Sequence, residues 1–138
     1  MGSVIQVVNG VSGATTTTSN TYVNVTGYSA TITPTSASNK ILVRCLPKAY
    51  VAFNADVYPV TTMQITANGS SVYEKGFYNY AGRAPNGYIE MQIDFNAEFL
   101  HSPATTSAIT YQVQIKVSTN ANTTVASYSE IILMEIVG

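Results

Sequence analysis

Charged residues are scarce in this sequence. Lys, Arg, Asp and Glu together make up 9% of the 138 residues, and the formal net charge at pH 7 is -1. An average soluble domain has roughly 25% charged residues, and a net charge of about 2 to 8 in magnitude usually keeps small domains from associating. The shortage of charge therefore predicts that other subunits cover much of the surface.

Other missing features exclude whole classes of function. The six basic and seven acidic residues form no run of either sign, so the sequence has no electrostatic footprint for nucleic acid. No apolar stretch approaches the ~20 residues that cross a bilayer, and the N-terminus lacks the features of a signal peptide. The single cysteine, Cys45, cannot form an internal disulfide. It lies in the apolar run Ile41–Leu46 and is expected to be a small buried hydrophobe.

The sequence pattern also shows no set of residues that is expected to come together as a catalytic site. Glu90 and Asp94 share a strand face, but four residues at about 3.3 Å each put their backbones roughly 13 Å apart. Glycosidase carboxylates need a separation of about 5 to 9.5 Å. His101 is the only histidine, and its parity places it at the end of an inward-facing row. We expect a protein that is not an enzyme and has no metal and no cofactor.

Alternation of apolar and polar residues with a period of two recurs along the chain. The clearest case is 110–118, and similar rows occupy 28–32, 63–67 and 89–95. Turn signals separate the rows, and Ser12–Asn20 is expected to be a loop or a weak edge segment. About eight to ten short strands of this kind predict an antiparallel β-sandwich, of which a jelly roll best fits one domain over residues 1–138.

The first and last strands break the alternating rule because they are apolar on both faces. One face of each strand packs on the core, so the other is expected to meet a further subunit. The residues predicted for this oligomer interface are Val4, Ile5, Val7, Ile131, Leu133, Glu135 and Val137. Glu135 then needs a neighbour's Arg or Lys, or else lies at a solvated rim.

A segment rich in aromatic residues runs from Tyr73 to Tyr88 and combines five rings with Gly, Asn, Pro and two basic residues. Such mixtures are typical of binding loops. The predicted contacts to a neighbouring shell protein or a host surface glycan are Tyr73, Phe77, Tyr78, Tyr80, Arg83 and Tyr88. In the alternative interpretation these rings line sheet rims, with the tyrosine hydroxyls in water.

Four segments, distributed over nearly the whole length of the chain, carry a resemblance to a known family. They are Gly2–Val8, Tyr22–Val43, Ser102–Tyr111 and Ile131–Gly138. These segments resemble a module common in tailed phages, notably marine and cyanobacterial ones, which appears as the distal domain of fibre or spike proteins and as small virion surface proteins. The overall resemblance to complement-like and tumour-necrosis-factor-like jelly-roll heads implies a homotrimer.

The resemblance and the composition together predict a virion structural protein. The expected role is a capsid-surface decoration, or cement, trimer that binds the major capsid protein and stabilises the shell. The alternative is a receptor-binding head of a tail fibre or spike, and an enzyme such as a depolymerase or esterase comes third. Either structural role places the protein on the virion surface after synthesis in the bacterial host cytoplasm.

Overall fold

The computed structural model describes residues 2–54, 58–78, 88–118, 121–125 and 128–138. In this part of the chain every regular element is a β-strand, and no helix is long and apolar enough to cross a membrane. The strands are β1 (Val4–Val11), β2 (Thr15–Thr17), β3 (Val23–Ile32), β4 (Lys40–Leu46), β5 (Lys48–Asn54), β6 (Val60–Ala67), β7 (Ser70–Tyr78), β8 (Tyr88–Asp94), β9 (Ala97–His101), β10 (Ile109–Val117), β11 (Ala121–Val125) and β12 (Glu130–Ile136).

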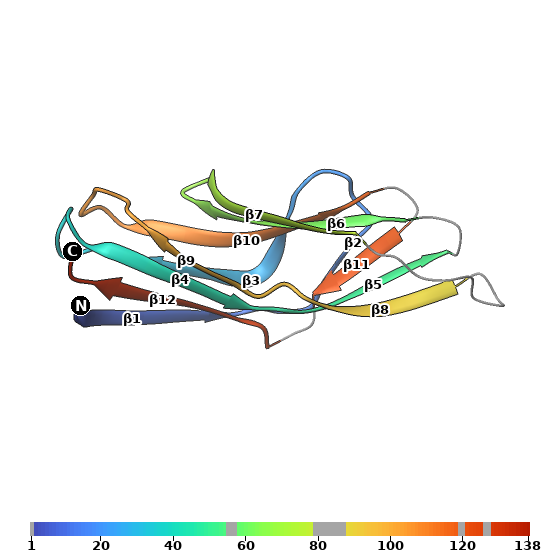
Figure 1. Ribbon diagram of the computed structural model, residues 1–138, viewed down its shortest axis with the longest axis horizontal. Helices are drawn as coiled ribbons and strands as arrows, with labels where there is room; N and C mark the ends of the chain where they lie inside the picture. The colour runs from blue at the N-terminus through green and yellow to red at the C-terminus, as the bar shows by residue number, and fades with distance from the viewer. Residues whose placement is uncertain (1, 55–57, 79–87, 119–120, 126–127) are drawn as a thin grey trace.

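The strands form an elongated sandwich of two layers (Figure 1). One layer is the sheet β3-β10-β6-β7. The other consists of two sheets placed end to end, β1-β12-β4-β9 and β2-β11-β5-β8. All strand pairs are antiparallel.

The strand order is that of a jelly roll. In the second layer β1 is followed by β2, β4 by β5, β8 by β9 and β11 by β12, so each pair is one long strand with a break. Joining the pairs leaves eight strands in two layers of four, the jelly-roll count. The predicted antiparallel sandwich and its jelly-roll topology are confirmed, and the breaks explain why more strands occur than the spacing predicted.

All four long strands break at the same level, which we call the joint. Pro47 separates β4 from β5 and has no N–H for a ladder. Two buried serines join the break between β1 and β2 to the break between β11 and β12: the Ser12 N–H donates to the Ser129 carbonyl (2.8 Å), and the Ser129 N–H donates to Ser12 Oγ (3.1 Å). Ser129 Oγ accepts from the Lys48 N–H (3.0 Å). The joint thus combines backbone hydrogen bonds with bonds to the two serine side chains.

The core lies between the layers and is made of the rows that alternation predicted. Tyr111, Val113, Ile115 and Val117 of β10 are all fully buried, as are Tyr28 of β3 and Cys45 of β4. Burial raises the pKa of the Cys45 thiol to about 12, so this side chain is the expected inert hydrophobe. The row on β8 is buried only in part: Ile93 is covered, but Met91 and Ile89 are partly exposed because β8 is an edge strand.

Two leucines of the sheet β1-β12-β4-β9 test this division between core and surface. Leu133 of β12 is fully buried, whereas Leu100 of β9 is 50% exposed. Leu133→Ala should lower the free energy of unfolding by about 2–5 kcal/mol because it leaves a cavity, and Leu100→Ala should change it by less than about 1 kcal/mol. Urea denaturation of dilute protein measures both, and equal losses would contradict the assignment of Leu133 to the core.

Candidate functional site

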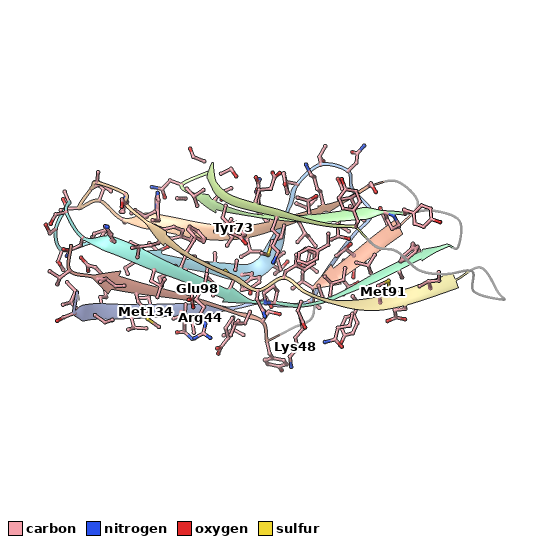
Figure 2. All side chains as sticks on the ribbon, in the orientation of Figure 1. Arg44, Lys48, Tyr73, Met91, Glu98 and Met134 are labelled. Atoms are coloured by element: carbon pink, nitrogen blue, oxygen red, sulfur yellow. The ribbon has the colours of Figure 1, made fainter. Side chains whose placement is uncertain are left out.

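Apolar side chains cover the outer surface of the sheet β1-β12-β4-β9. Val7 pairs with Met134, Met134 with Leu42, and Leu42 with Leu100, so one apolar row crosses all four strands. Residues directly opposite each other on adjacent strands point to the same side of a sheet. Val7 and Leu100, at the ends of the row, are 58% and 50% exposed. Figure 2 labels Met134, Arg44 and Glu98 on this sheet.

The rows on either side of this one are also apolar near β12. Ile132 lies between Asn9 and Arg44, and Ile136 lies between Val4 and Lys40. We call the whole surface the apolar face: Val4, Ile5, Val7, Leu42, Leu100, Ile132, Met134 and Ile136. In the described residues every exposed Val, Ile or Leu side chain belongs to this sheet or follows directly on one of its strands. The apolar face is therefore where the exposed aliphatic side chains of the described residues gather, and the exposed rings of Tyr50, Tyr58, Tyr78 and Tyr128 do not belong to it.

Charged residues of both signs border the apolar face. Arg44 Nε lies 3.4 Å from Glu98 Oε2, and both side chains remain well exposed. An ion pair this accessible contributes only about 0–1 kcal/mol to the stability of the chain. A partner surface that covers this border must nevertheless carry charges complementary to those of the pair.

The structure places some residues of the predicted oligomer interface on the surface and others in the core. Val4, Ile5, Val7 and Val137 are 46 to 58% exposed at the apolar face or at the end of its sheet. Ile131, Leu133 and Glu135 instead point into the sandwich and are fully buried, so they cannot form the interface expected of them. Alternation on β12 turns Ile132, Met134 and Ile136 outward in their place. The sequence pattern missed these residues because β12 is apolar at both parities.

Glu135 has neither of the two environments that its sequence predicted. Its Oε1 accepts hydrogen bonds from the Thr35 N–H (2.6 Å), Thr35 Oγ1 (2.9 Å) and Asn39 Nδ2 (2.7 Å). Gln6, in the amide orientation that its surroundings favour, donates to Glu135 Oε2 (3.3 Å) and to the Thr33 carbonyl (3.2 Å). The carboxylate is thus satisfied within the chain and ties the loop after β3 to β12 and β1.

These contacts also determine the ionisation of Glu135. Burial alone raises the pKa of the carboxyl group, but the hydrogen bonds from Asn39 and Thr35 outweigh burial and hold the pKa below its ordinary value. The folded chain therefore favours the ionised form of Glu135.

In the described part of the aromatic segment, most rings pack against other side chains of the sandwich. Tyr73 stacks on Phe99, with ring centroids 5.1 Å apart, and Phe77 meets Phe95 edge-on at 4.5 Å. Both rings pack against the core, which fits the sheet-rim interpretation better than the binding one. Tyr78 is 71% exposed. The predicted contacts Tyr80 and Arg83, and the side chain of Tyr88, lie outside the described residues.

His101 ends an inward-facing row, as its parity predicted. Its Nδ1 lies 2.6 Å from the hydroxyl of the buried Tyr111, and the two rings meet edge to face. Burial lowers the pKa of His101. Among the described residues, no three His, Cys, Asp or Glu side chains are grouped so that they could hold a metal ion.

Among known proteins, the chain is similar only to solved structures, and the similarity is one of fold. No family model and no curated protein matches the chain. A solved structure of the infectious bursal disease virus Gt strain matches at 11% identity and a TM-score of 0.48, over 94% of this chain and 32% of that one. The VP2 subviral particle of the same virus matches at 14% identity and a TM-score of 0.43, over 93% and 32%. Dimeric latent PorU from Porphyromonas gingivalis matches at 8% identity and a TM-score of 0.39, over 97% and 13%.

These similarities are weak, and the chain spans about a third or less of the length of the three matched chains. At TM-scores of 0.39 to 0.48 they carry no conclusion about function. The jelly-roll assignment rests on the strand order itself.

The low pKa of Glu135 makes a pH dependence of stability testable. The stabilisation is complete above the pKa of the free side chain, about 4.3, and disappears as the pH falls through the lower pKa of the folded state. The free energy of unfolding should therefore fall on acidification, and it should fall less in Glu135→Gln, which cannot ionise. Urea denaturation across the acidic range measures both proteins. The other carboxylates are common to both, so parallel curves would show that Glu135 is not responsible.

Proposed function

We propose that the chain is a non-enzymatic structural protein of a virus particle. In this proposal it forms a homotrimer through the apolar face and decorates the outer surface of the capsid. The observation that carries the proposal is the continuous row Val7, Met134, Leu42 and Leu100, which leaves apolar side chains in water on an isolated chain. The shortage of charge and the resemblance of the sequence to a phage virion module support it further.

The hydrophobic effect supplies the driving force for this assembly. Covering apolar surface is favourable by about 25 cal/mol for each Å² removed from water. Obligate subunit interfaces are more apolar than transient ones and resemble a domain core cut in two. The apolar face has this character, and its border supplies both a cation, Arg44, and an anion, Glu98. Lys40, opposite Ile136, adds a second cation, so a neighbouring copy that covers this border must place acidic groups near Lys40 and Arg44.

Decoration would stabilise the shell by mass action. A protein that binds the assembled shell, and not its separate subunits, lowers the free energy of the assembled state in proportion to its affinity and concentration. The mechanism needs no catalytic group.

A pair of lysine substitutions tests the assembly surface. Val7→Lys combined with Leu100→Lys places charges at both ends of the apolar row, and burying them on association is costly. The doubly substituted protein should be a monomer at loadings where the natural sequence is a trimer, as measured by light scattering after gel filtration. Ser71→Lys, an exposed change on β7 in the other layer, is the control and should leave the trimer intact. A natural sequence that runs as a monomer at all loadings would overturn the assembly proposal.

Particles test the proposed decoration role. Virus particles without the protein should release their genome at a lower temperature than complete particles, because the stabilising ligand is gone. Adding back the protein, or the Ser71→Lys control, should restore the release temperature, which a fluorescent nucleic-acid dye reports. Adding back the Val7→Lys, Leu100→Lys protein should not. Equal heat resistance with and without the protein would contradict a cementing role.

One observation favours a receptor-binding head at a fibre or spike tip as a second candidate. Tyr78 places a ring that is 71% exposed at the end of β7, and exposed aromatic rings are common in recognition surfaces. Electron microscopy of labelled protein on intact particles separates the two roles. Label spread over the shell supports decoration, and label confined to the tail fibres supports the receptor-binding head.

A further inference from the structure

The outer surface of the other layer, the sheet β3-β10-β6-β7, is polar and ordered by hydrogen bonds between side chains. Gln64 Nε2 donates to Gln114 Oε1 (2.5 Å), and Gln114 Nε2 donates to Asn24 Oδ1 (2.7 Å). The register continues this line to Glu74, so four planar side chains cross the four strands. We call Asn24, Gln114, Gln64 and Glu74 the amide row. Three strand spacings of about 4.8 Å make it about 14 Å long.

A tyrosine ring lies beside the amide row and is held from two sides. The Tyr22 hydroxyl donates to Glu74 Oε2 (2.6 Å), and Lys116 Nζ lies 4.3 Å from the centroid of the Tyr22 ring. Burial and the hydrogen bond to Glu74 both raise the pKa of Tyr22, so the hydroxyl stays protonated. The ring and the row are thus fixed before any ligand arrives, which lowers the entropy cost of binding.

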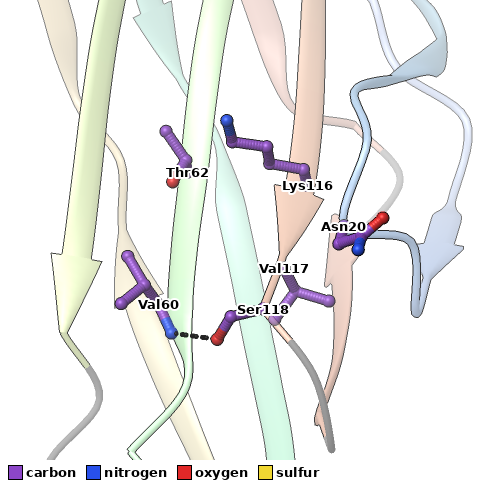
Figure 3. Close-up of a pocket in the computed structure, with 6 residues that line it drawn as sticks. All are labelled: Asn20, Val60, Thr62, Lys116, Val117 and Ser118. Carbon is purple, nitrogen blue, oxygen red and sulfur yellow. Dashed lines mark hydrogen bonds between the residues drawn. The ribbon is translucent and has the colours of Figure 1, made fainter.

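Lys116, which contacts the ring, also lines a pocket of about 180 Å³ (Figure 3). Its lining combines apolar and polar side chains: Asn20, Val60, Thr62, Lys116, Val117 and Ser118. Gly76 of β7 lies opposite Thr62 of β6. Because glycine has no side chain, the outer surface of β7 has a gap between Glu74 and Tyr78. The pocket and this gap leave space on the sheet next to the amide row.

We propose that this surface binds a neutral saccharide. Sugar rings carry hydroxyl groups around an apolar ring face, and they match planar amide and carboxylate groups set beside an aromatic ring. The site has one cation, Lys116, and one anion, Glu74, so its charges balance and do not favour a polyanion. The length of the amide row exceeds a single sugar ring, and the ligand is therefore a chain of sugars lying across the strands. The site is in the layer opposite the apolar face and does not depend on the proposed assembly.

Saturation-transfer NMR with the purified full chain tests the site. The probes are glucose, galactose, mannose and N-acetylglucosamine, each as the single sugar and as a linked tetrasaccharide. A site this shallow should bind a tetrasaccharide with a Kd on the order of 1 mM, and the corresponding single sugar should bind more weakly. Equal signals from single sugar and tetrasaccharide would contradict a chain lying along the row. If no probe receives saturation from the natural sequence, the proposal is wrong.

The chain offers a matched pair of controls. Tyr22→Ala and Gln114→Ala should each weaken binding about tenfold because each removes one of the fixed planar groups. Tyr50 and Gln92 are exposed cross-strand partners on the opposite layer, so Tyr50→Ala and Gln92→Ala remove the same residue types elsewhere. These two variants should bind as the natural sequence does. Equal affinity in all four variants, or equal losses, would overturn the proposal, and circular dichroism verifies that each variant folds.

Discussion

Each strand of this sandwich must turn one side toward the shared core, and the period of two then fixes which residues remain outside. The effect is clearest on β12, where Leu133 is buried among apolar side chains while Met134, the next residue, lies on the apolar face. A shift of one residue would exchange the two sets. Glu135 helps to hold the register of β12, because its carboxylate accepts hydrogen bonds from Thr35 and Asn39 only when its side chain points into the sandwich. The core therefore determines the chemistry of the outer surface.

Much of the fold follows from the sequence, since a period of two is visible along the chain wherever one side of a strand is polar. The row from Tyr111 to Val117 and the burial of Cys45 are predictable for this reason. Where both sides are apolar, as in β12, the pattern does not indicate which parity is inward. Contacts between residues distant in sequence are also invisible: Glu135 and Asn39 are 96 positions apart, and Gln114 and Asn24 are 90 apart. Only the strand order brings such residues together.

The two layers present opposite chemistry to their surroundings. Aliphatic side chains dominate the outer surface of β1-β12-β4-β9, whereas amides, hydroxyls and a carboxylate dominate that of β3-β10-β6-β7. Each surface carries few charges, in line with the low charge of the whole sequence: Arg44 and Glu98 lie at the border of one, and Glu74 and Lys116 lie on the other. If copies associate through the aliphatic side, the amide-bearing side of each copy is turned to the outside.

The joint has a consequence for how the molecule opens. Ser12, Ser129 and Pro47 lie at one level of one layer and divide it into the sheets β1-β12-β4-β9 and β2-β11-β5-β8. Cooperative units in proteins tend to follow such boundaries. We therefore expect the amide protons of β2-β11-β5-β8 to exchange with solvent independently of those of β1-β12-β4-β9, the sheet that carries both chain termini.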